Sequence, residues 1–116
     1  MIKTYRDLEV YKKAYQASLE IHEITLRFPS FETYELGSQI RRASKGIPMN
    51  IAEGFGKNDT EIEFKRYLKI AIGSCDEIQV QLEYCRDLKY MSKEEYEKYR
   101  GMYEEIGKML NGMRNK

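Results

Sequence analysis

The sequence offers few residues whose type and spacing would support catalysis. Its single histidine is His22, and it has no Glu-x-x-His pair of the kind that the helices of a di-iron bundle contribute. Ser74 and Cys75 have no histidine at helical spacing that would activate them as nucleophiles. The neighbouring carboxylates Glu94 and Glu95 are explained by the start of a helix, where negative charge is stabilising. We therefore expect a protein that is not an enzyme, with no catalytic residue, no metal and no cofactor.

The segment from Gly54 to Lys57 has the residue types of a phosphate-binding loop without its spacing. Such a loop would need glycine where the sequence has Ile51 and a hydroxyl where it has Asn58, and it would follow a strand. The glycines instead indicate the end of a helix, where glycine can take the left-handed conformation of a C-cap.

The remaining group of residues that could support a chemical function consists of lysines and arginines. Cations that share one surface can contact the phosphates of a nucleic acid. Seven such residues fall on one predicted helix, the turn after it and the start of the next helix: Arg41, Arg42, Lys45, Lys57, Lys65, Arg66 and Lys69. Charged helix faces are most often only solvated, and a further alternative is pairing between subunits, because acidic residues dominate from Asp76 to Glu105. The formal net charge of +1 argues against binding through bulk charge but leaves a local patch open.

The length and composition favour one domain over residues 1–116. A chain of 116 residues is large enough for one hydrophobic core without a metal or disulfide. It has no apolar run long enough to span a bilayer and no signal peptide, so we expect a cytoplasmic protein. Cys75 and Cys85 lie about 15 Å apart along one predicted helix, too far for a disulfide, and are expected to be reduced core thiols.

Four amphipathic helices account for the chain. Capping boxes at Thr4–Asp7, Thr60–Glu63 and Ser92–Glu95 open three of them, and the second begins near Thr33 or Tyr34. The first is expected to end near Phe28, the second at the glycines of 54–56 and the third near Leu88. Buried seams at three- and four-residue steps are predicted at Val10, Ala14, Ala17, Ile21, Ile24 and Phe28; Ile40, Ala43, Ile47, Ile51 and Gly54; Phe64, Leu68, Ala71, Cys75, Ile78, Leu82 and Cys85; and Tyr96, Tyr99, Tyr103, Ile106, Leu110 and Met113. This pattern predicts an all-α fold, an antiparallel up-and-down four-helix bundle.

Pro48 lies in the middle of the second predicted helix. It removes the hydrogen bond to the Ser44 carbonyl, so we expect a kink there, with the Asn50 amide or the Ser44 hydroxyl bonding nearby backbone groups. Gly73 weakens the third helix, which suggests that another helix approaches closely at that point.

The first helix carries a second apolar stripe opposite its buried seam: Leu8, Tyr15, Leu19, His22 and Leu26. Packing one bundle requires only the seam. We therefore expect this stripe to be an interface, and in a small chain the expected partner is another copy of the protein.

Five stretches carry a family resemblance: Thr4–Ala14, Phe28–Pro29, Ser38–Ala43, Ile47–Gly56 and Phe64–Gly73. They closely resemble the four-helix bundle proteins found in intervening sequences of large-subunit (23S) ribosomal RNA genes, some of which carry a ribosomal-protein label. The match spans nearly the whole chain. Its central motif is present, with Pro48, Asn50, Glu53 and Gly54 in place.

That family is similar to the accessory variability determinant protein of diversity-generating retroelements. The resemblance implies a barrel-like homopentamer that binds RNA or DNA, and a reverse transcriptase, through a basic surface, with Arg41 and Arg42 as the candidate cations within the shared motif. It thus implies a non-enzymatic, nucleic-acid-associated accessory or scaffold protein. Two alternatives stay open: a pure assembly module without nucleic-acid binding, and an enzyme or small-molecule binder whose site forms between subunits and includes His22 or Glu53.

Overall fold

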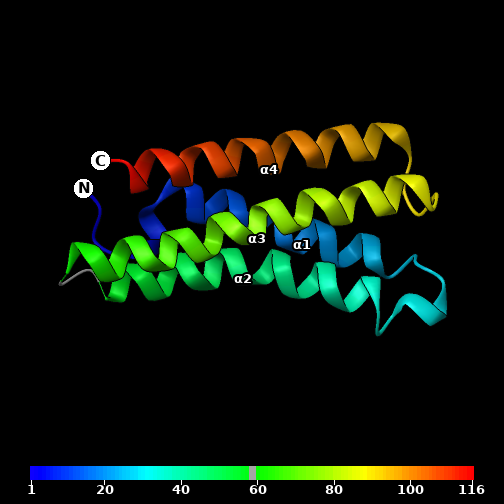
Figure 1. The fold of residues 1–116 in the computed structure, drawn as a ribbon, viewed down its shortest axis with the longest axis horizontal. Coiled ribbons are helices and arrows are strands. Elements are labelled where there is room, and N and C mark those ends of the chain that lie inside the picture. Colours follow the sequence, from blue (N-terminus) through cyan, green and yellow to red (C-terminus); the bar gives the residue numbers. More distant parts are fainter. Residues whose placement is uncertain (58–59) are drawn as a thin grey trace.

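The described part of the chain folds into four long helices and two short 3₁₀ turns (Figure 1). The computed structural model describes residues 1–57 and 60–116. The elements in chain order are η1 (Tyr5–Asp7), α1 (Glu9–Thr25), η2 (Ser30–Glu32), α2 (Leu36–Gly56), α3 (Glu61–Asp87) and α4 (Lys93–Arg114). The described residues contain no strand, and the predicted all-α four-helix bundle is confirmed. Within those same residues, no helix is both long and apolar enough to cross a membrane.

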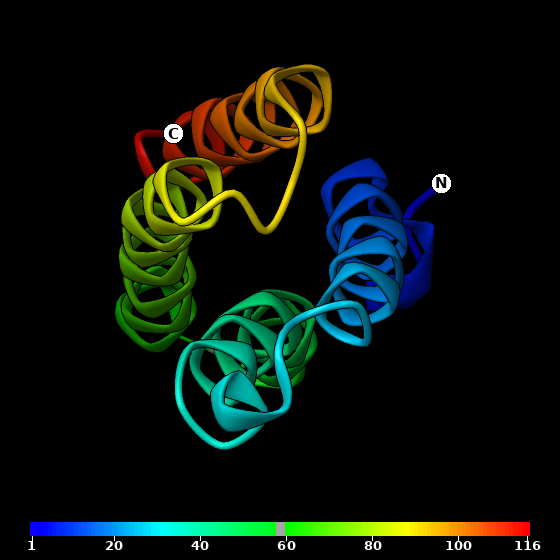
Figure 2. The same cartoon turned by 90° about the vertical axis from the view of Figure 1, so that its right-hand side faces the viewer.

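The four helices surround one axis in chain order (Figure 2). Consecutive helices pack side by side, and α4 returns beside α1 to close the bundle. The body measures 44 × 24 × 21 Å, and both termini lie at the same end of it (Figure 1). Between α1 and α4, Lys13 pairs with Glu105 and Arg27 pairs with Glu95, so these two helices run in opposite directions.

One hydrophobic core fills the space between the helices. Each helix turns the residues of its predicted seam inward, because a spacing of three and four residues returns to the same side of an α-helix. All of the predicted seam residues are buried except Phe64 and Met113, which are half-buried and pack against the core.

The N-terminal region differs from the prediction at both ends of its helix. Thr4 and Asp7 form the predicted capping box, but it caps the 3₁₀ turn η1 and not the long helix. Helix α1 begins at Glu9 and ends at Thr25, and the chain reaches Phe28 through a turn. The 3₁₀ turn separates the cap from the helix because Leu8 takes an extended backbone conformation between them.

The other two predicted caps lie at helix starts. The Ser92 hydroxyl accepts the Glu95 N–H and the Glu95 carboxylate accepts the Ser92 N–H, each at 3.0 Å, which opens α4. At the start of α3, the Thr60 hydroxyl accepts the Glu63 N–H at 3.1 Å. These bonds satisfy amide groups that have no partner within the helix.

Two predictions about glycine are wrong. No described glycine has a positive φ, so α2 does not end in a left-handed glycine cap; it continues through Gly56, and Lys57 ends it. A Cβ built on Gly73 meets no atom within 4 Å, so no helix approaches closely there. The close approach lies at Gly54 instead, where a Cβ would stand 2.7 Å from Tyr67 Cβ.

Pro48 is buried within α2, which continues on both sides of it. The two polar groups expected near it both bond backbone carbonyls: the Asn50 amide donates to the Gly46 oxygen at 2.8 Å, and the Ser44 hydroxyl donates to the Arg41 oxygen at 3.0 Å. The kink itself stays a prediction.

Candidate nucleic-acid interface

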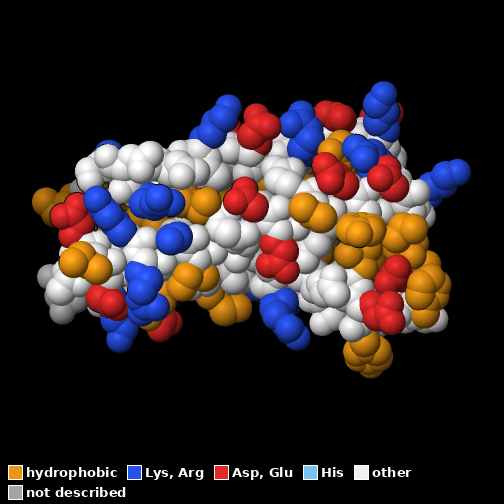
Figure 3. All heavy atoms as spheres, viewed as in Figure 1, with side chains coloured by type: hydrophobic (Ala, Val, Ile, Leu, Met, Phe, Trp, Pro, Cys, Tyr) orange, Lys and Arg blue, Asp and Glu red, His pale blue; other side chains and the backbone are white. Residues whose placement is uncertain are grey.

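The packing of α2 against α3 places the candidate cations. Gly46 lies against Ser74, and Gly54 lies against Tyr67 further along. At 1.5 Å per residue, Arg42 and Lys69 are therefore about 13 Å apart along the bundle axis, on opposite sides of the Gly46 contact. Lysine and arginine side chains gather at the end of this face where α3 begins (Figure 3). The seven cations thus form a string along α2 and α3 that is densest at one end.

Arg41 is held inside the fold. Its guanidinium donates to the Thr25 hydroxyl at 3.0 Å and to the Thr33 carbonyl at 2.7 Å, which ties the end of α1 to the turn before α2. A Cβ on Gly37 would lie 2.8 Å from the Glu32 backbone carbonyl oxygen and 2.9 Å from Arg41 Nη1, and because the carbonyl cannot move as a side chain can, a glycine is needed there. The half-buried Arg41 therefore has a structural use that the sequence did not reveal.

Lys65 and Arg66 are each paired with a carboxylate of their own helix. Lys65 Nζ lies 3.0 Å from Glu61 and 3.2 Å from the Lys116 carbonyl. Arg66 makes two bonds to Glu63, at 3.3 and 3.1 Å, and these raise the pKa of its guanidinium. Exposed pairs of this kind are screened by solvent and contribute little, so a phosphate would compete with them.

Arg42, Lys45 and Lys69 form no ion pair within the described part of the chain. Arg42 and Lys69 are exposed, and Lys45 is half-buried. Lys57 is also exposed, at the end of α2 nearest to the start of α3. These are the cations with most freedom to meet an external phosphate.

Helix α4 brings further cations, which are not among the seven predicted from the sequence, to the same end. The bond from Lys65 to the Lys116 carbonyl places the C-terminus beside the start of α3, and Arg114 lies in the last turn of α4. The basic end of the third predicted helix and the basic end of the fourth were both visible in the sequence. Their proximity follows only from the pairing of α3 with α4.

The second stripe of α1 is at the surface of the single chain. Tyr15, Leu19 and Leu26 are exposed, whereas Leu8 and His22 are half-buried. Leu19 and Leu26 line a recess of about 550 Å³ between α1 and α4. Leu8 packs against the core, whereas Tyr15, Leu19 and Leu26 lie outside it, and the predicted role of the stripe as an interface stays a prediction.

Ion pairs span the contact between α1 and α4. Lys13 lies 2.9 Å from Glu105, Lys98 lies 3.1 Å from Glu20, and the Tyr99 hydroxyl donates to Glu20 at 3.1 Å. Partial burial alone would raise the pKa of Glu20, but the bonds that its carboxylate accepts hold the pKa below its ordinary value. The contact between α1 and α4 depends on charge more than the other three contacts between neighbouring helices do. We call these two ion pairs and the Tyr99 hydrogen bond, together with the pair of Arg27 and Glu95, the α1–α4 straps.

His22 and Glu53, the residues considered for a site between subunits, lie on different helices. His22 is half-buried on α1, Glu53 is exposed on α2, and neither lines the recesses between α1 and α4, α3 and α4, or α2 and α3. No group of three His, Cys, Asp or Glu in the described residues would hold a metal ion. Burial raises the pKa values of Cys75 and Cys85 to about 12, so both remain thiols at neutral pH.

The fold defines the class of the protein as a small all-α four-helix bundle. Residues 6–112, nearly the whole bundle, match the family model described as 23S rRNA-intervening sequence protein, and the chain belongs to that family.

Its fold is similar to the crystal structure of a protein of unknown function from the S23 ribosomal protein family of Bacteroides thetaiotaomicron. The TM-score is 0.80 and the sequence identity 24%, over 92% of this chain and 99% of the other. No curated protein matches the sequence.

Proposed function

We propose that this protein is a non-enzymatic, self-assembling four-helix bundle that serves as an accessory or scaffold protein on nucleic acid. The observation that carries the proposal is the row of exposed apolar side chains on α1, Tyr15, Leu19 and Leu26, outside a core that is already closed. Large apolar side chains grouped on one surface typically mark an interface.

The expected partner of this stripe is a second copy of the chain. The Tyr15 ring stacks on Tyr11 with centroids 6.0 Å apart, so it is held in place before any partner arrives. Beside it, the recess lined by Leu19 and Leu26 offers a concave site for apolar side chains of a neighbour. A closed ring of five copies is the assembly that the family resemblance favours, and such rings form through one repeated contact.

Nucleic acid is the proposed ligand of the cations on α2 and α3. The family description names 23S rRNA, which favours RNA over DNA. Arg42, Lys45 and Lys69 supply charges that are not neutralised by a carboxylate in the described structure, as phosphate contact requires. A reverse transcriptase is a further proposed partner, and it rests on the resemblance alone.

A pure assembly module is the second candidate function. It is favoured by the internal bonds of Arg41, Lys65 and Arg66, which engage three of the seven candidate cations. An enzyme or binding site between subunits would need polar groups to converge there, and the half-buried His22 is the described side chain on the stripe with that chemistry.

The experiment that tests assembly is a mass measurement in dilute solution by analytical ultracentrifugation. Wild type is expected at several times the chain mass of 13.8 kDa, and Leu19→Glu/Leu26→Glu at the mass of one chain. Ile62→Glu is the control, because it charges an apolar residue on α3 that is more exposed than Leu19 and Leu26, and it should leave the assembly intact. Wild type at 13.8 kDa would refute self-assembly.

A further inference from the structure

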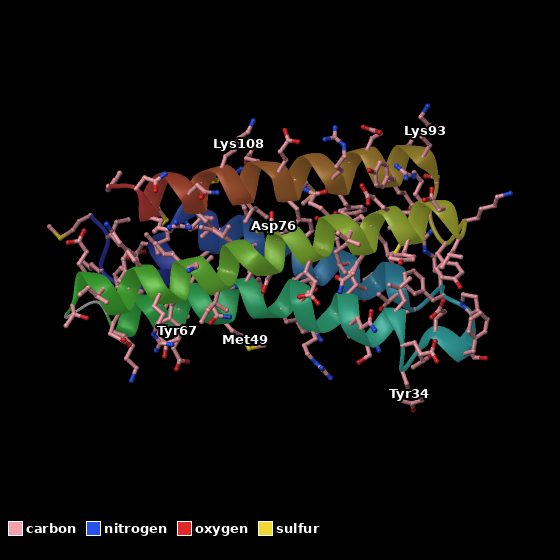
Figure 4. All side chains as sticks on the ribbon, in the orientation of Figure 1. Tyr34, Met49, Tyr67, Asp76, Lys93 and Lys108 are labelled. Carbon is pink, nitrogen blue, oxygen red and sulfur yellow. The ribbon has the colours of Figure 1, made fainter. Side chains whose placement is uncertain are left out.

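A second exposed apolar surface lies at the end of the bundle away from the termini. We call it the end patch: Phe31, Tyr34, Tyr84 and Leu88, all exposed. Two of them precede α2 and two lie in or after the last turns of α3. Hydrophobic side chains gather at this end with carboxylates among them (Figure 3), and Tyr34, 90% exposed, points away from the body of the protein (Figure 4).

A recess of about 340 Å³ opens within this patch, between α2 and α3. It is lined by Glu32, Glu35, Leu36, Gln39, Tyr84 and Leu88. Its lining therefore combines two carboxylates with apolar side chains and contains no lysine or arginine. An apolar wall beside a negative charge fits a cation on an aliphatic stem.

Glu32 is the residue of the recess that most strongly favours a positively charged ligand. It is only 7% exposed, its Oε2 atom accepts the Tyr90 hydroxyl at 2.7 Å, and its Oε1 atom lies at 3.4 Å from the Leu36 N–H. In the described residues it forms no ion pair, because the neighbouring Arg41 bonds Thr25 and Thr33 instead. A buried carboxylate without a cation is costly, so a cation that enters the recess gains a partner that the fold does not supply.

The surroundings add to the negative field at this end. Glu35 and Glu83 are exposed and in no ion pair of the described structure, and Asp87 is neutralised by Arg86 at 2.7 Å. The exposed Lys89, which follows Leu88 and also forms no ion pair in the described structure, offsets one of these negative charges. The opposite end of the same face carries the candidate cations. The charge at the end patch therefore favours a basic partner.

We propose that the end patch docks a segment of a partner protein that carries a lysine or arginine next to apolar side chains. The cation binds Glu32 and Glu35, its stem packs on Leu88, and the Tyr84 ring supplies a further attraction for the charge. Phe31 and Tyr34 lie outside the recess and extend the contact beyond one side chain, which favours a protein segment over a free polyamine. The site uses neither the α1 stripe nor the α2–α3 cations, so it stands apart from the proposed function.

The test is a selection of random 12-residue peptides on the folded, full-length protein, followed by fluorescence anisotropy with the best synthetic peptide. Selected peptides are expected to carry lysine or arginine beside an apolar residue, and their binding should weaken as salt rises. Glu35→Lys and Leu88→Asp, both at exposed positions that leave the core intact, should each weaken binding at least about tenfold. Glu53→Lys, an exposed carboxylate on α2 outside the patch, is the control and should change it less than about twofold.

Three results would overturn the proposal. The first is that no peptide is selected, or that the selected peptides lack basic residues. The second is that Glu35→Lys and Glu53→Lys weaken peptide binding equally, or that spermidine displaces the labelled peptide as well as the unlabelled peptide does. The third is that Glu35→Lys or Leu88→Asp lowers the mass of the assembly, because the patch would then be a contact between copies of this chain. None of these outcomes depends on whether the α1 stripe mediates assembly.

Discussion

At the scale of single residues, Gly54 and Gly73 illustrate opposite uses of glycine in helices. Gly54 has no room for a side chain, because a Cβ would stand 2.7 Å from Tyr67 Cβ and 3.5 Å from the Phe64 carbonyl oxygen. Gly73 is exposed, and nothing lies within 4 Å of a Cβ built on it. The first glycine sets the distance between α2 and α3, and the second only weakens a helix.

The two glycines give a matched prediction. Gly54→Ala should lower the free energy of unfolding by about 1–3 kcal/mol, because either α2 or Tyr67 must move. Gly73→Ala should raise it by about 0.5–1 kcal/mol, because alanine loses less backbone entropy in a helix. Urea unfolding followed by circular dichroism, at one protein concentration, measures both. Equal effects of the two substitutions would contradict the packing at Gly54.

At the scale of the helices, the contact between α1 and α4 is the one that ion pairs stabilise. Glu20 and Glu95 both have pKa values below their ordinary value of 4.5. For Glu95 the largest cause is the Ser92 N–H that its carboxylate accepts, followed by burial, which acts in the opposite direction, and then by Arg27. A carboxyl whose pKa is lower in the folded state stabilises the fold above its unfolded-state pKa.

The stability that the α1–α4 straps contribute should therefore depend on pH. The contribution of the straps is fully present above about pH 4.5 and is lost as the pH falls through the lower folded-state pKa values. Glu20→Gln/Glu95→Gln should be less stable than wild type at pH 7 and should lose less stability between pH 5 and pH 3. Thermal unfolding across this range measures the difference, with Glu53→Gln as the control. A residual slope is expected from Asp7 and Asp87, whose pKa values are also lowered; parallel curves would count against the straps.

The proline of α2 gives a second prediction at the scale of the element. Pro48→Ala restores an N–H that can donate to the Ser44 carbonyl, so α2 should straighten. We expect the mass of the assembly to change while the helix content by circular dichroism stays nearly constant. Met49→Ala, at the exposed next position, is the control. An assembly unaltered by Pro48→Ala would refute a structural role of the kink.

For the whole molecule, the features that could be predicted are those that arise within one helix. The buried seam of α1 and the exposed stripe with Tyr15 and Leu26 follow from helical periodicity alone. The bonds of Arg41 and the burial of Glu32 could not be predicted, because each depends on how the turn before α2 packs on other elements. The end patch was missed for the same reason, since its two halves lie some 50 residues apart in the chain and meet only in the fold.

The uneven distribution of charge over the molecule leads to the prediction on RNA binding. Lysine and arginine side chains gather on one face at the end where α3 begins, whereas hydrophobic side chains with carboxylates among them gather at the other end of that face (Figure 3). If phosphates bind at the basic end, the logarithm of the affinity should fall linearly with the logarithm of the salt concentration. Arg42→Gln/Lys69→Gln should flatten that slope by about 1.5, because two phosphate contacts are lost.

The control for RNA binding changes the same net charge elsewhere. Lys12 lies on α1 and Lys93 at the start of α4, where its side chain points into solvent (Figure 4). Lys12→Gln/Lys93→Gln should lower the affinity only through net charge and leave most of the slope in place. Fluorescence anisotropy with a labelled RNA measures all three proteins across a salt series. If the two double variants behave alike, the cations of α2 and α3 form no site, and if wild type does not bind at low salt, the protein acts as an assembly module alone.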